Sequence, residues 1–263
     1  MVKYWELAKS QMKVDSAYTA WYWADTCSAI LRLLITYYFW LAVYDHNDSI
    51  KGIDFKTMLT YIVVAMIIEQ YVSGVGDGLA RQIKDGSIVL ELLKPYHMLN
   101  KLIALDIGSK ISAFFRATIP IVVIAFLFLD LSFPTNILTY FYFIVSFIIG
   151  ALIGAQIDLM IGIVAFWTVN VWGVRVLREA IIKFFSGALI PISLFPHWFQ
   201  NVSQFLPFQA MVYVPTTIFT GQVSSGSQIA LSIGIQIFWL ISMYALLRIL
   251  WLFAIRKITI FGG

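Results

Sequence analysis

Long apolar stretches recur along almost the whole chain and are separated by short polar segments. A helix needs about 20 mostly apolar residues to cross roughly 30 Å of hydrocarbon, because every backbone amide must be satisfied within the crossing. Six stretches meet this requirement: residues 26–44, 57–75, 110–130, 137–168, 171–192 and 229–252. The pattern predicts an all-α integral membrane protein with six transmembrane helices, which form a single transmembrane domain over residues 1–263.

The composition supports this class and excludes several others. Hydrophobic residues make up 60% and charged residues 12% of the chain, whereas soluble domains carry roughly a quarter charged residues. The single Cys27 excludes internal disulfides, and three scattered histidines give no metal-ligand spacing, so we expect no metal site. The net charge of +4 lies in short segments between apolar stretches, so we interpret it as a signal of membrane orientation and expect no nucleic-acid partner.

Lysine and arginine gather in alternate polar segments. With six crossings, one side of the membrane receives Lys3, Lys9, Lys13, Arg81, Lys84, Lys94, Lys101, Arg256 and Lys257. The other side receives only Lys51 and Lys56, which are accompanied by three aspartates. Positive loops stay in the cytoplasm. The sequence therefore predicts a multi-pass protein of the cytoplasmic (inner) cell membrane with both termini cytoplasmic.

Residues 1–25 precede the first predicted crossing and do not resemble a signal peptide, since they contain acidic residues and no cleavage site after a short apolar core. An aromatic cluster at Tyr18, Trp21, Tyr22 and Trp23 is typical of a helix at the lipid headgroups. We expect an amphipathic interfacial helix here; a plain cytosolic helix is the alternative.

The predicted cytoplasmic segment 77–101 contains a second short helix. Gly86 breaks the chain, Ser87 can cap a helix, and apolar residues then recur at helical spacing until Pro95. A helix with one apolar face can rest on the membrane surface or dock onto another protein. The pattern alone leaves both interpretations open.

The outer segment 193–221, between the fifth and sixth crossings, is apolar but divided by prolines into pieces too short to span a bilayer. An ordinary loop is far more polar. We expect a re-entrant outer hairpin that dips into the outer leaflet as a cap, with five aromatic side chains buried: Phe195, Trp198, Phe199, Phe205 and Phe208.

The fifth predicted crossing is unusual because it contains Arg175, Arg178, Glu179 and Lys183. Residues four apart can pair along one helix face, which predicts the pairs Arg175–Glu179 and Glu179–Lys183. These charges can line a water-accessible path or an interface between subunits. Alternatively, long side chains such as those of Arg175 and Arg178 can reach the cytoplasmic headgroups.

Arg32 and Glu69 lie at similar depths in the first two crossings, which predicts a buried ion pair between them. Asp158 can either face packing partners or reach the inner headgroups. A stripe of small residues at Ser146, Gly150, Gly154 and Gly162, interrupted by Asp158, is typical of close helix packing, by default within one subunit, with a dimer contact as the alternative.

Several catalytic signatures are missing. The sequence has no GxxxxGK[ST] phosphate loop, HExxH motif or nucleophile elbow, so we expect no ATP site, no bound cofactor and no enzymatic activity in this chain. An intramembrane lipid-modifying enzyme and an ATPase-independent channel or secondary transporter are the alternatives to an ATP-driven transporter. The first needs polar residues that converge at one depth, and the second commonly shows an inverted repeat.

Two local patterns resemble the ABC type-2 exporter permeases. The first is the run Ile83–Pro95, IKDGSIVLELLKP, a glycine turn followed by a Leu-Leu-basic-Pro ending. The second is an ordered series in the C-terminal half: Phe166-Trp167, Ser186-Gly187, Pro191, Phe195-Pro196, Leu206-Pro207-Phe208, Pro215 and Gly221. The resemblance covers the layout of most of the chain and implies a permease that exports substrate by alternating access.

The resemblance also implies partners and site residues. Two ABC ATPase subunits would carry the ATP and Mg²⁺, and a second permease chain, identical or homologous, would complete the assembly in membrane lipid. The ATPase-coupling segment would comprise Asp85, Gly86, Ser87, Ile88, Leu90, Glu91 and Lys94. The first, second and fifth crossings would border the translocation path, which places Arg32, Glu69 and Lys183 near it. The substrate stays open.

Overall fold

The computed structural model describes residues 2–17, 19–74, 76–94, 96, 98–168 and 171–256 of the chain. The N-terminal half contains α1 (Val2–Ala17), α2 (Thr19–Tyr44), β1 (Ser49–Ile50), β2 (Ile53–Asp54), α3 (Phe55–Val72), α4 (Gly76–Lys84), α5 (Ile88–Leu92), α6 (Met98–Ala113) and α7 (Ile119–Phe128). The C-terminal half contains α8 (Ile137–Ile163), α9 (Trp172–Phe185), α10 (His197–Gln204), α11 (Tyr213–Phe219) and α12 (Gly226–Ile255). Short 3₁₀ turns lie at Val164–Phe166 and Ile192–Leu194, and a π-helical segment, Phe114–Thr118, joins α6 to α7.

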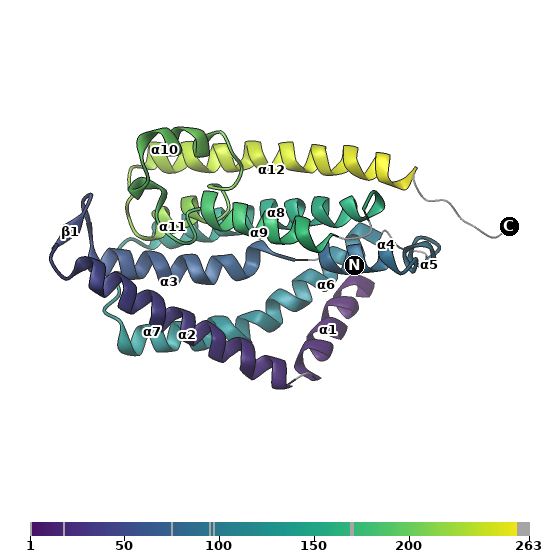
Figure 1. The fold of residues 1–263 in the computed structure, drawn as a ribbon, viewed down its shortest axis with the longest axis horizontal. Helices are drawn as coiled ribbons and strands as arrows, with labels where there is room; N and C mark the ends of the chain where they lie inside the picture. Colours follow the sequence, from purple (N-terminus) through teal and green to yellow (C-terminus); the bar gives the residue numbers. More distant parts are fainter. Residues whose placement is uncertain are drawn as a thin grey trace.

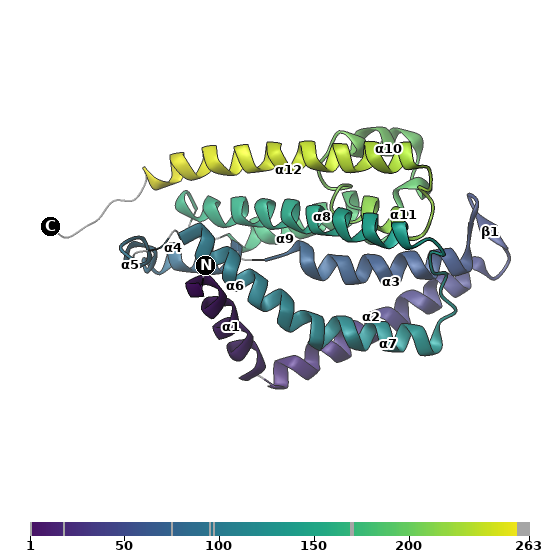
Figure 2. The ribbon, with the colours of Figure 1, turned by 180° about the vertical axis from the view of Figure 1, so that it is seen from behind.

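The long helices lie side by side and give the molecule two distinct ends (Figure 1). The β1–β2 hairpin, α10 and α11 lie at one end, which we call the β1 end. The start of α1, α4, α5 and the end of α12 lie at the other, which we call the α5 end. Figure 2 shows the molecule from behind, with α7 in front of α2.

Five helical stretches are long and apolar enough to cross a membrane within the described ranges: Thr26–Tyr44, Phe55–Lys84, Asn100–Phe128, Ile137–Phe166 and Gly226–Ile255. Four of them bury only about a fifth of their residues or less, whereas Phe55–Lys84 is 71% buried. Large apolar side chains such as Ile35, Phe128 and Leu231 are more than two-thirds exposed. A surface of this kind is stable in lipid and not in water, so the structure agrees with a multi-pass, all-α membrane protein.

The third stretch begins about ten residues earlier than the sequence predicts. The prediction excluded Asp106 and began the crossing at Lys110, but these residues are four apart on α6 and form an ion pair of 2.6 Å. Pairing lowers the cost of placing both charges inside a bilayer. The helical stretch that is long and apolar enough to cross therefore extends from Asn100 rather than from residue 110.

The fifth predicted crossing differs from the others. α9 has only 14 residues and carries Arg175, Arg178, Glu179 and Lys183, so at 1.5 Å per residue it covers about 21 Å, less than the hydrocarbon thickness. α9 nevertheless lies beside α8 and leads the chain back toward the β1 end, where the segment from Ser186 to Pro191 continues without a helix (Figure 1).

The N-terminal segment is divided differently from the prediction of one interfacial helix over residues 1–25. α1 ends at Ala17, and residues 19–25 belong to α2. α1 packs along α6, where the backbone oxygen of Ala8 would lie 2.3 Å from any Cβ added at Gly108. Three side chains of the predicted aromatic cluster, those of Tyr18, Trp21 and Tyr22, lie outside the described part of the structure.

Small residues on α8 allow other parts of the backbone to approach this helix closely. A Cβ added at Gly150 would lie 2.6 Å from the backbone oxygen of Met211, and one at Gly154 would lie 2.4 Å from that of Val72. The stripe predicted from the sequence therefore packs helices within this subunit, as expected by default. Gln236 of α12 donates hydrogen bonds to the backbone oxygens of Ser146 and Ala210 from a fully buried position.

The β1 end is closed by the hairpin and by the segment between α9 and α12. Lys51 occupies a left-handed turn, with φ of 48°, and donates to the backbone oxygens of Ser193, Leu194 and Phe195 at 3.2–3.3 Å. α10 and α11 lie alongside the long helices at this end of the molecule (Figure 1). The hairpin thus ties the N-terminal half to this cap.

The prediction that five aromatic side chains of the cap are buried is wrong for two of them. Phe199 is 2% exposed and stacks on Phe195 at 4.4 Å and on Phe185 at 5.0 Å. Trp198 and Phe205, however, are 68% and 78% exposed. α10 has only one inward face, so side chains on its other face remain outside. Phe195 and Phe208 are partly buried.

Candidate functional site

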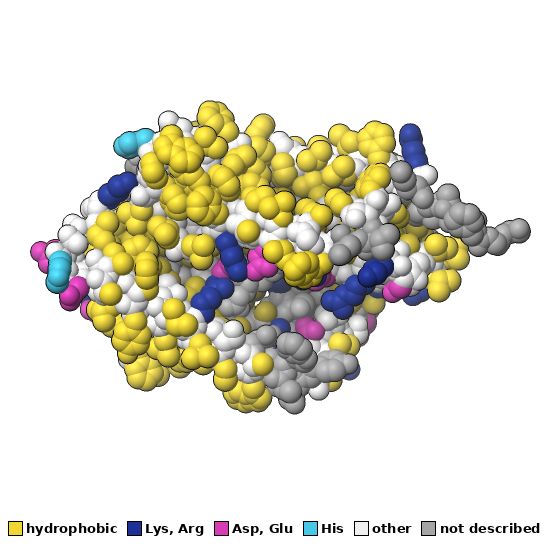
Figure 3. Space-filling view, viewed as in Figure 1, with side chains coloured by type: hydrophobic (Ala, Val, Ile, Leu, Met, Phe, Trp, Pro, Cys, Tyr) yellow, Lys and Arg dark blue, Asp and Glu magenta, His cyan; other side chains and the backbone are white. Residues whose placement is uncertain are grey.

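A cavity of about 800 Å³ lies between α2, α3, α4, α6 and α9 and is lined mainly by polar and charged side chains. In Figure 3 a hollow is visible between α2 and α9, with dark blue and magenta side chains around it. Every residue that the sequence assigned to the translocation path or to its charge pairs lines this cavity: Arg32, Glu69, Arg175, Arg178, Glu179 and Lys183. Tertiary structure therefore gathers side chains that are more than 100 residues apart in the sequence.

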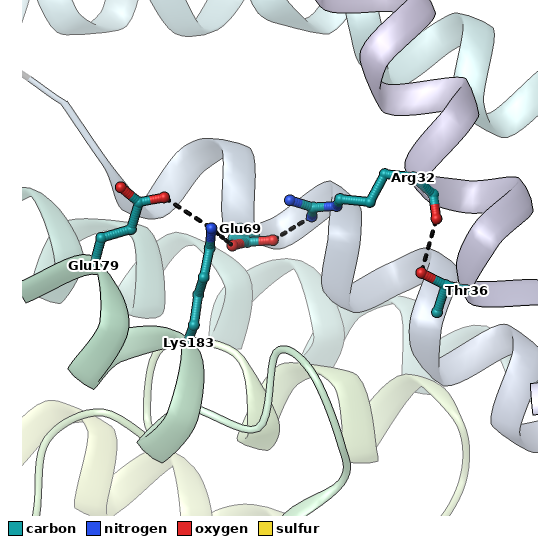
Figure 4. A network of polar contacts seen from close by, with 5 residues as sticks. All are labelled: Arg32, Thr36, Glu69, Glu179 and Lys183. Carbon is teal, nitrogen blue, oxygen red and sulfur yellow. Dashed lines mark hydrogen bonds and ion pairs between the residues drawn. The ribbon is translucent and has the colours of Figure 1, made fainter. Parts of the chain in front are cut away.

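Four of these side chains form one chain of alternating charge across α2, α3 and α9 (Figure 4). Glu69 accepts from Arg32, which confirms the predicted contact. Lys183 lies 3.8 Å from Glu69 and 2.8 Å from Glu179, so the predicted Glu179–Lys183 pair is present as well. The Arg32–Glu69 pair is not buried, however, because the Arg32 side chain is 47% exposed at the cavity wall.

Arg175 and Arg178 bind helices other than their own. Arg175 forms an ion pair with Asp77 of α4 instead of the predicted pair with Glu179. Arg178 lies 3.1 Å from Asp158 of α8, and its side chain is 10% exposed. Arg178 therefore does not reach out to headgroups, and Asp158 faces a packing partner.

Asp158 also joins α8 to the start of α4. Its Oδ2 accepts from the backbone N–H groups of Gly74 and Gly76 at 3.0 and 2.8 Å. The first amides of a helix have no intrahelical acceptor and attract negative charge. A carboxylate from a helix distant in the sequence thus caps α4 and holds it against the inner part of the cavity.

Sequence reasoning missed five charged residues of this site: Asp77, Arg81, Asp106, Lys110 and Arg116. All five lie in stretches that are long and apolar enough to span a membrane, two in Phe55–Lys84 and three in Asn100–Phe128. An ionisable residue inside a membrane span marks a functional site by default. That signal was present at Arg116 in particular. It is located in the π-helical segment Phe114–Thr118, near the middle of the stretch Asn100–Phe128.

The second candidate site is the tip at the α5 end. Ile88 is 3% exposed and anchors α5, whereas Leu90 and Leu93 are 65% and 78% exposed. Gly86 precedes the helix with φ of 76°, a conformation that favours glycine. The predicted amphipathic helix is thus present as a single turn, and its outward face is apolar.

Glu91 organises this tip through three hydrogen bonds. Its carboxylate accepts from Lys94 at 2.6 Å, Lys101 at 2.5 Å and Tyr96 at 2.8 Å. Burial raises the pKa of Glu91, but these donors outweigh burial and hold the pKa at about 2. The tip is therefore tied to the start of α6 by a carboxylate that stays ionised at neutral pH.

Ser87 does not cap α5 as the sequence predicts. The Ser87 side chain makes no cap hydrogen bond, and Asp85 Oδ1 instead accepts from the Ser87 N–H at 2.9 Å and from its hydroxyl at 2.6 Å. These hydrogen bonds lower the pKa of Asp85 from its usual value. The turn is therefore closed by the residue before Gly86 rather than by the residue after it.

A second cavity, of about 930 Å³, opens between α6, α8 and α12 and is lined mostly by apolar residues. Arg248 of α12 lies on its wall. Within the described residues the guanidinium of Arg248 makes no ion pair or side-chain hydrogen bond. This arginine is an intramembrane cation outside the charged cavity.

Comparison with known proteins gives one family. The family model described as "ABC-2 family transporter protein" matches residues 30–262, which is most of the chain. No curated protein matches the sequence significantly.

Proposed function

The chain belongs to the ABC-2 transporter family, and from this premise we propose that it is the permease subunit of an ATP-driven exporter of the cytoplasmic membrane. A separate pair of ABC ATPase subunits would supply ATP and Mg²⁺, and a second permease chain, identical or homologous, would complete the path. In this proposal α9 and its continuation form the fifth of six crossings. The α5 end faces the cytoplasm, and both termini lie on the cytoplasmic side.

The exposed apolar face of the tip is the observation that carries this proposal. Leu90 and Leu93 lie outermost on a short helix whose inner side is fixed by Ile88 and by the Glu91 hydrogen bonds. Exposed apolar side chains mark a contact with a protein or with a membrane, and we assign these two to a protein because the resemblance places the ATPase-coupling segment here. An ATPase groove that grips this turn can push it as a rigid lever, because the Glu91–Lys101 bond passes the force to α6.

The charged cavity is the observation that supports a transport path through this chain. Its walls come from α2, α3 and α9, and the ion pairs that join these helices are partly exposed to the cavity. Partly exposed pairs contribute little stability and exchange partners readily. Lys183 already lies between two carboxylates, so α9 can shift relative to α3 without leaving a charge unpaired.

Replacement of Leu90 by aspartate tests the coupling. A buried leucine contributes about 1.5–3 kcal/mol at an interface, so we expect Leu90→Asp to lower the amount of co-purified ATPase, and the ATP hydrolysis of the purified complex, at least tenfold. Membrane insertion and yield should stay unchanged. The measurements are quantitative mass spectrometry of the tagged, detergent-extracted complex and its ATPase rate.

Val14→Asp is the matched control, because Val14 is a half-exposed apolar residue on α1 and lies away from the tip. The control should retain the ATPase. If Leu90→Asp and Leu93→Asp both retain it as well, the docking site is elsewhere. If the wild-type chain transports substrate without any ATPase, the proposed function itself is wrong.

A further inference from the structure

The cavity has more cationic than acidic residues. It is lined by seven lysines and arginines and by five carboxylates. Each of the five carboxylates forms an ion pair, in the combinations Glu69–Arg32, Asp77–Arg175, Asp106–Lys110, Asp158–Arg178 and Glu179–Lys183. The two remaining cations, Arg81 and Arg116, make no ion pair or side-chain hydrogen bond with any described residue.

Arg116 is the more informative of the two because of its depth. It lies near the middle of the stretch Asn100–Phe128, where a charge without a partner is costly. Among the residues that the structure describes, no carboxylate pairs with it there. Such a residue is retained for a ligand or for a water-filled space, and Arg116 lines a cavity with room for either.

The backbone around Arg116 is fixed on two sides. Thr26 of α2 donates to the backbone oxygen of Arg116 at 3.0 Å, and the hydroxyls of Thr118 and Tyr71 lie 2.8 Å apart. The π-helical turn changes the direction of side chains along α6 and α7, and such turns are frequent at functional sites. The local fold therefore holds the base of Arg116 and leaves its guanidinium to the cavity.

Arg81 has a different place on the same cavity. It is an exposed residue in the last turn of α4, next to the tip at the α5 end. An anion entering from this end meets Arg81 first and Arg116 deeper in the bilayer. Unpaired cations in a cavity with low-dielectric walls concentrate anions from solution.

We propose that the cavity selects a substrate bearing an anionic group, a carboxylate, sulfonate or phosphate, and that Arg116 binds this group in mid-membrane. Arginine is suited to the role, since its planar guanidinium donates two parallel hydrogen bonds to such oxyanions and stays charged at all accessible pH values. The inference rests on the proposed function, because it assigns the cavity to the transport path. The same chemistry fits a soluble organic anion and an anionic lipid headgroup.

The test is equilibrium binding of two dyes to the full chain in nanodiscs of phosphatidylcholine. Carboxyfluorescein and rhodamine 6G share a xanthene core but carry opposite charge. We expect saturable binding of carboxyfluorescein only, after subtraction of empty nanodiscs, and a loss of affinity of about 10-fold to 100-fold in Arg116→Gln, the range for a hydrogen bond to a charged group. Arg116→Lys should fall between the two.

Arg248→Gln is the matched control, since Arg248 is an intramembrane arginine on the wall of the other cavity. It should bind carboxyfluorescein as the wild type does. Equal affinity of the wild type and Arg116→Gln, or an equal loss in Arg248→Gln, overturns the proposal. If Arg116→Gln does not fold, preference of the wild-type chain for rhodamine 6G, or no preference, overturns it as well.

A further arm identifies the source of the anion. Nanodiscs that contain phosphatidylglycerol should compete with carboxyfluorescein if the ligand is a lipid headgroup, and should not compete if it is a soluble anion; the proposal holds in both cases. Dye binding needs no ATPase. Failure of this test while Leu90→Asp still lowers ATPase association would therefore remove the anion site and leave the exporter assignment intact.

Discussion

The charged cavity and the aromatic cap are held together by opposite means. Around the cavity, α2, α3, α4, α8 and α9 are joined by ion pairs, several of which are half exposed. In the cap, between α9 and α12, no residue from Ser193 to Gln228 is charged. Ring contacts hold it instead, together with hydrogen bonds from Lys51, Gln200 and Gln236 to backbone oxygens.

The difference suits two different tasks. Ion pairs beside water can exchange partners at low cost, as Lys183 between Glu69 and Glu179 illustrates. Stacked rings and hydrogen-bonded backbone oxygens have a single arrangement of low energy, because interdigitated side chains do not deform continuously. A path that changes its access needs the first kind of contact, and a fixed closure at the β1 end needs the second.

The largest effect is expected from the buried pair that joins α9 to α8. Arg178→Gln leaves Asp158 buried at 7% exposure without its cation, which should lower the free energy of unfolding by about 3–5 kcal/mol. Thermal unfolding in detergent, monitored by circular dichroism, measures this loss. The double change Arg178→Gln with Asp158→Asn should recover part of it.

Glu179→Gln is the control for this pair, because the Glu179 side chain is 61% exposed and its pair with Lys183 should contribute about 1 kcal/mol or less. If Arg178→Gln and Glu179→Gln lower the free energy of unfolding equally, the Arg178–Asp158 and Glu179–Lys183 pairs do not differ in burial. The contrast within the cavity would then disappear.

A somewhat smaller effect is expected in the cap. Phe199→Ala removes a ring that is 2% exposed and stacks on Phe185 and Phe195, so the free energy of unfolding should fall by about 3 kcal/mol. Trp198→Ala on the outer face of the same helix should change it by less than about 0.5 kcal/mol. The same thermal measurement applies, and high salt should leave the Phe199→Ala loss unchanged. A loss that depends on salt would contradict the apolar account of the cap.

The smallest effect is expected from pH at the tip. The pKa of Glu91 is lowered from 4.5 to about 2, so its contribution to stability is complete above about pH 4.5 and is lost as the pH falls toward 2. Hydrogen exchange of the α5 amides, corrected for intrinsic rates, should accelerate between pH 5 and pH 2.5. The α10 amides should not respond in the same way, since α10 contains no carboxylate.

Glu91→Gln separates this effect from general acid unfolding. The variant should exchange faster than the wild type at pH 6 and show little further change at low pH. A wild-type tip whose exchange is independent of pH would show that the hydrogen bonds of Glu91 do not stabilise α5.

The prediction of the fold was good where it depended on hydrophobicity alone. The crossings that end near Tyr44, Phe128 and Ile255 follow from long apolar runs. It was poor where charges lie inside a helix, as at Asp106 and Lys110, although these two residues have the same four-residue spacing from which the Glu179–Lys183 pair was predicted. It also assigned burial to Trp198 and Phe205 from residue type, although only one face of α10 is turned inward.

The amino-acid sequence by itself determined that the chain is a helical membrane protein, where most of its crossings lie, and that a glycine turn precedes the helix at the tip. These properties are local, since the hydrophobicity of a run of residues and the left-handed conformation of Gly86 require no distant partner. Only the tertiary structure decided that Arg178 pairs with Asp158, that Arg175 pairs with Asp77, and that Arg116 has no carboxylate partner in the described part of the chain. Charges find their partners through space, and the distance between two helices in the bundle is set by the packing of the whole molecule.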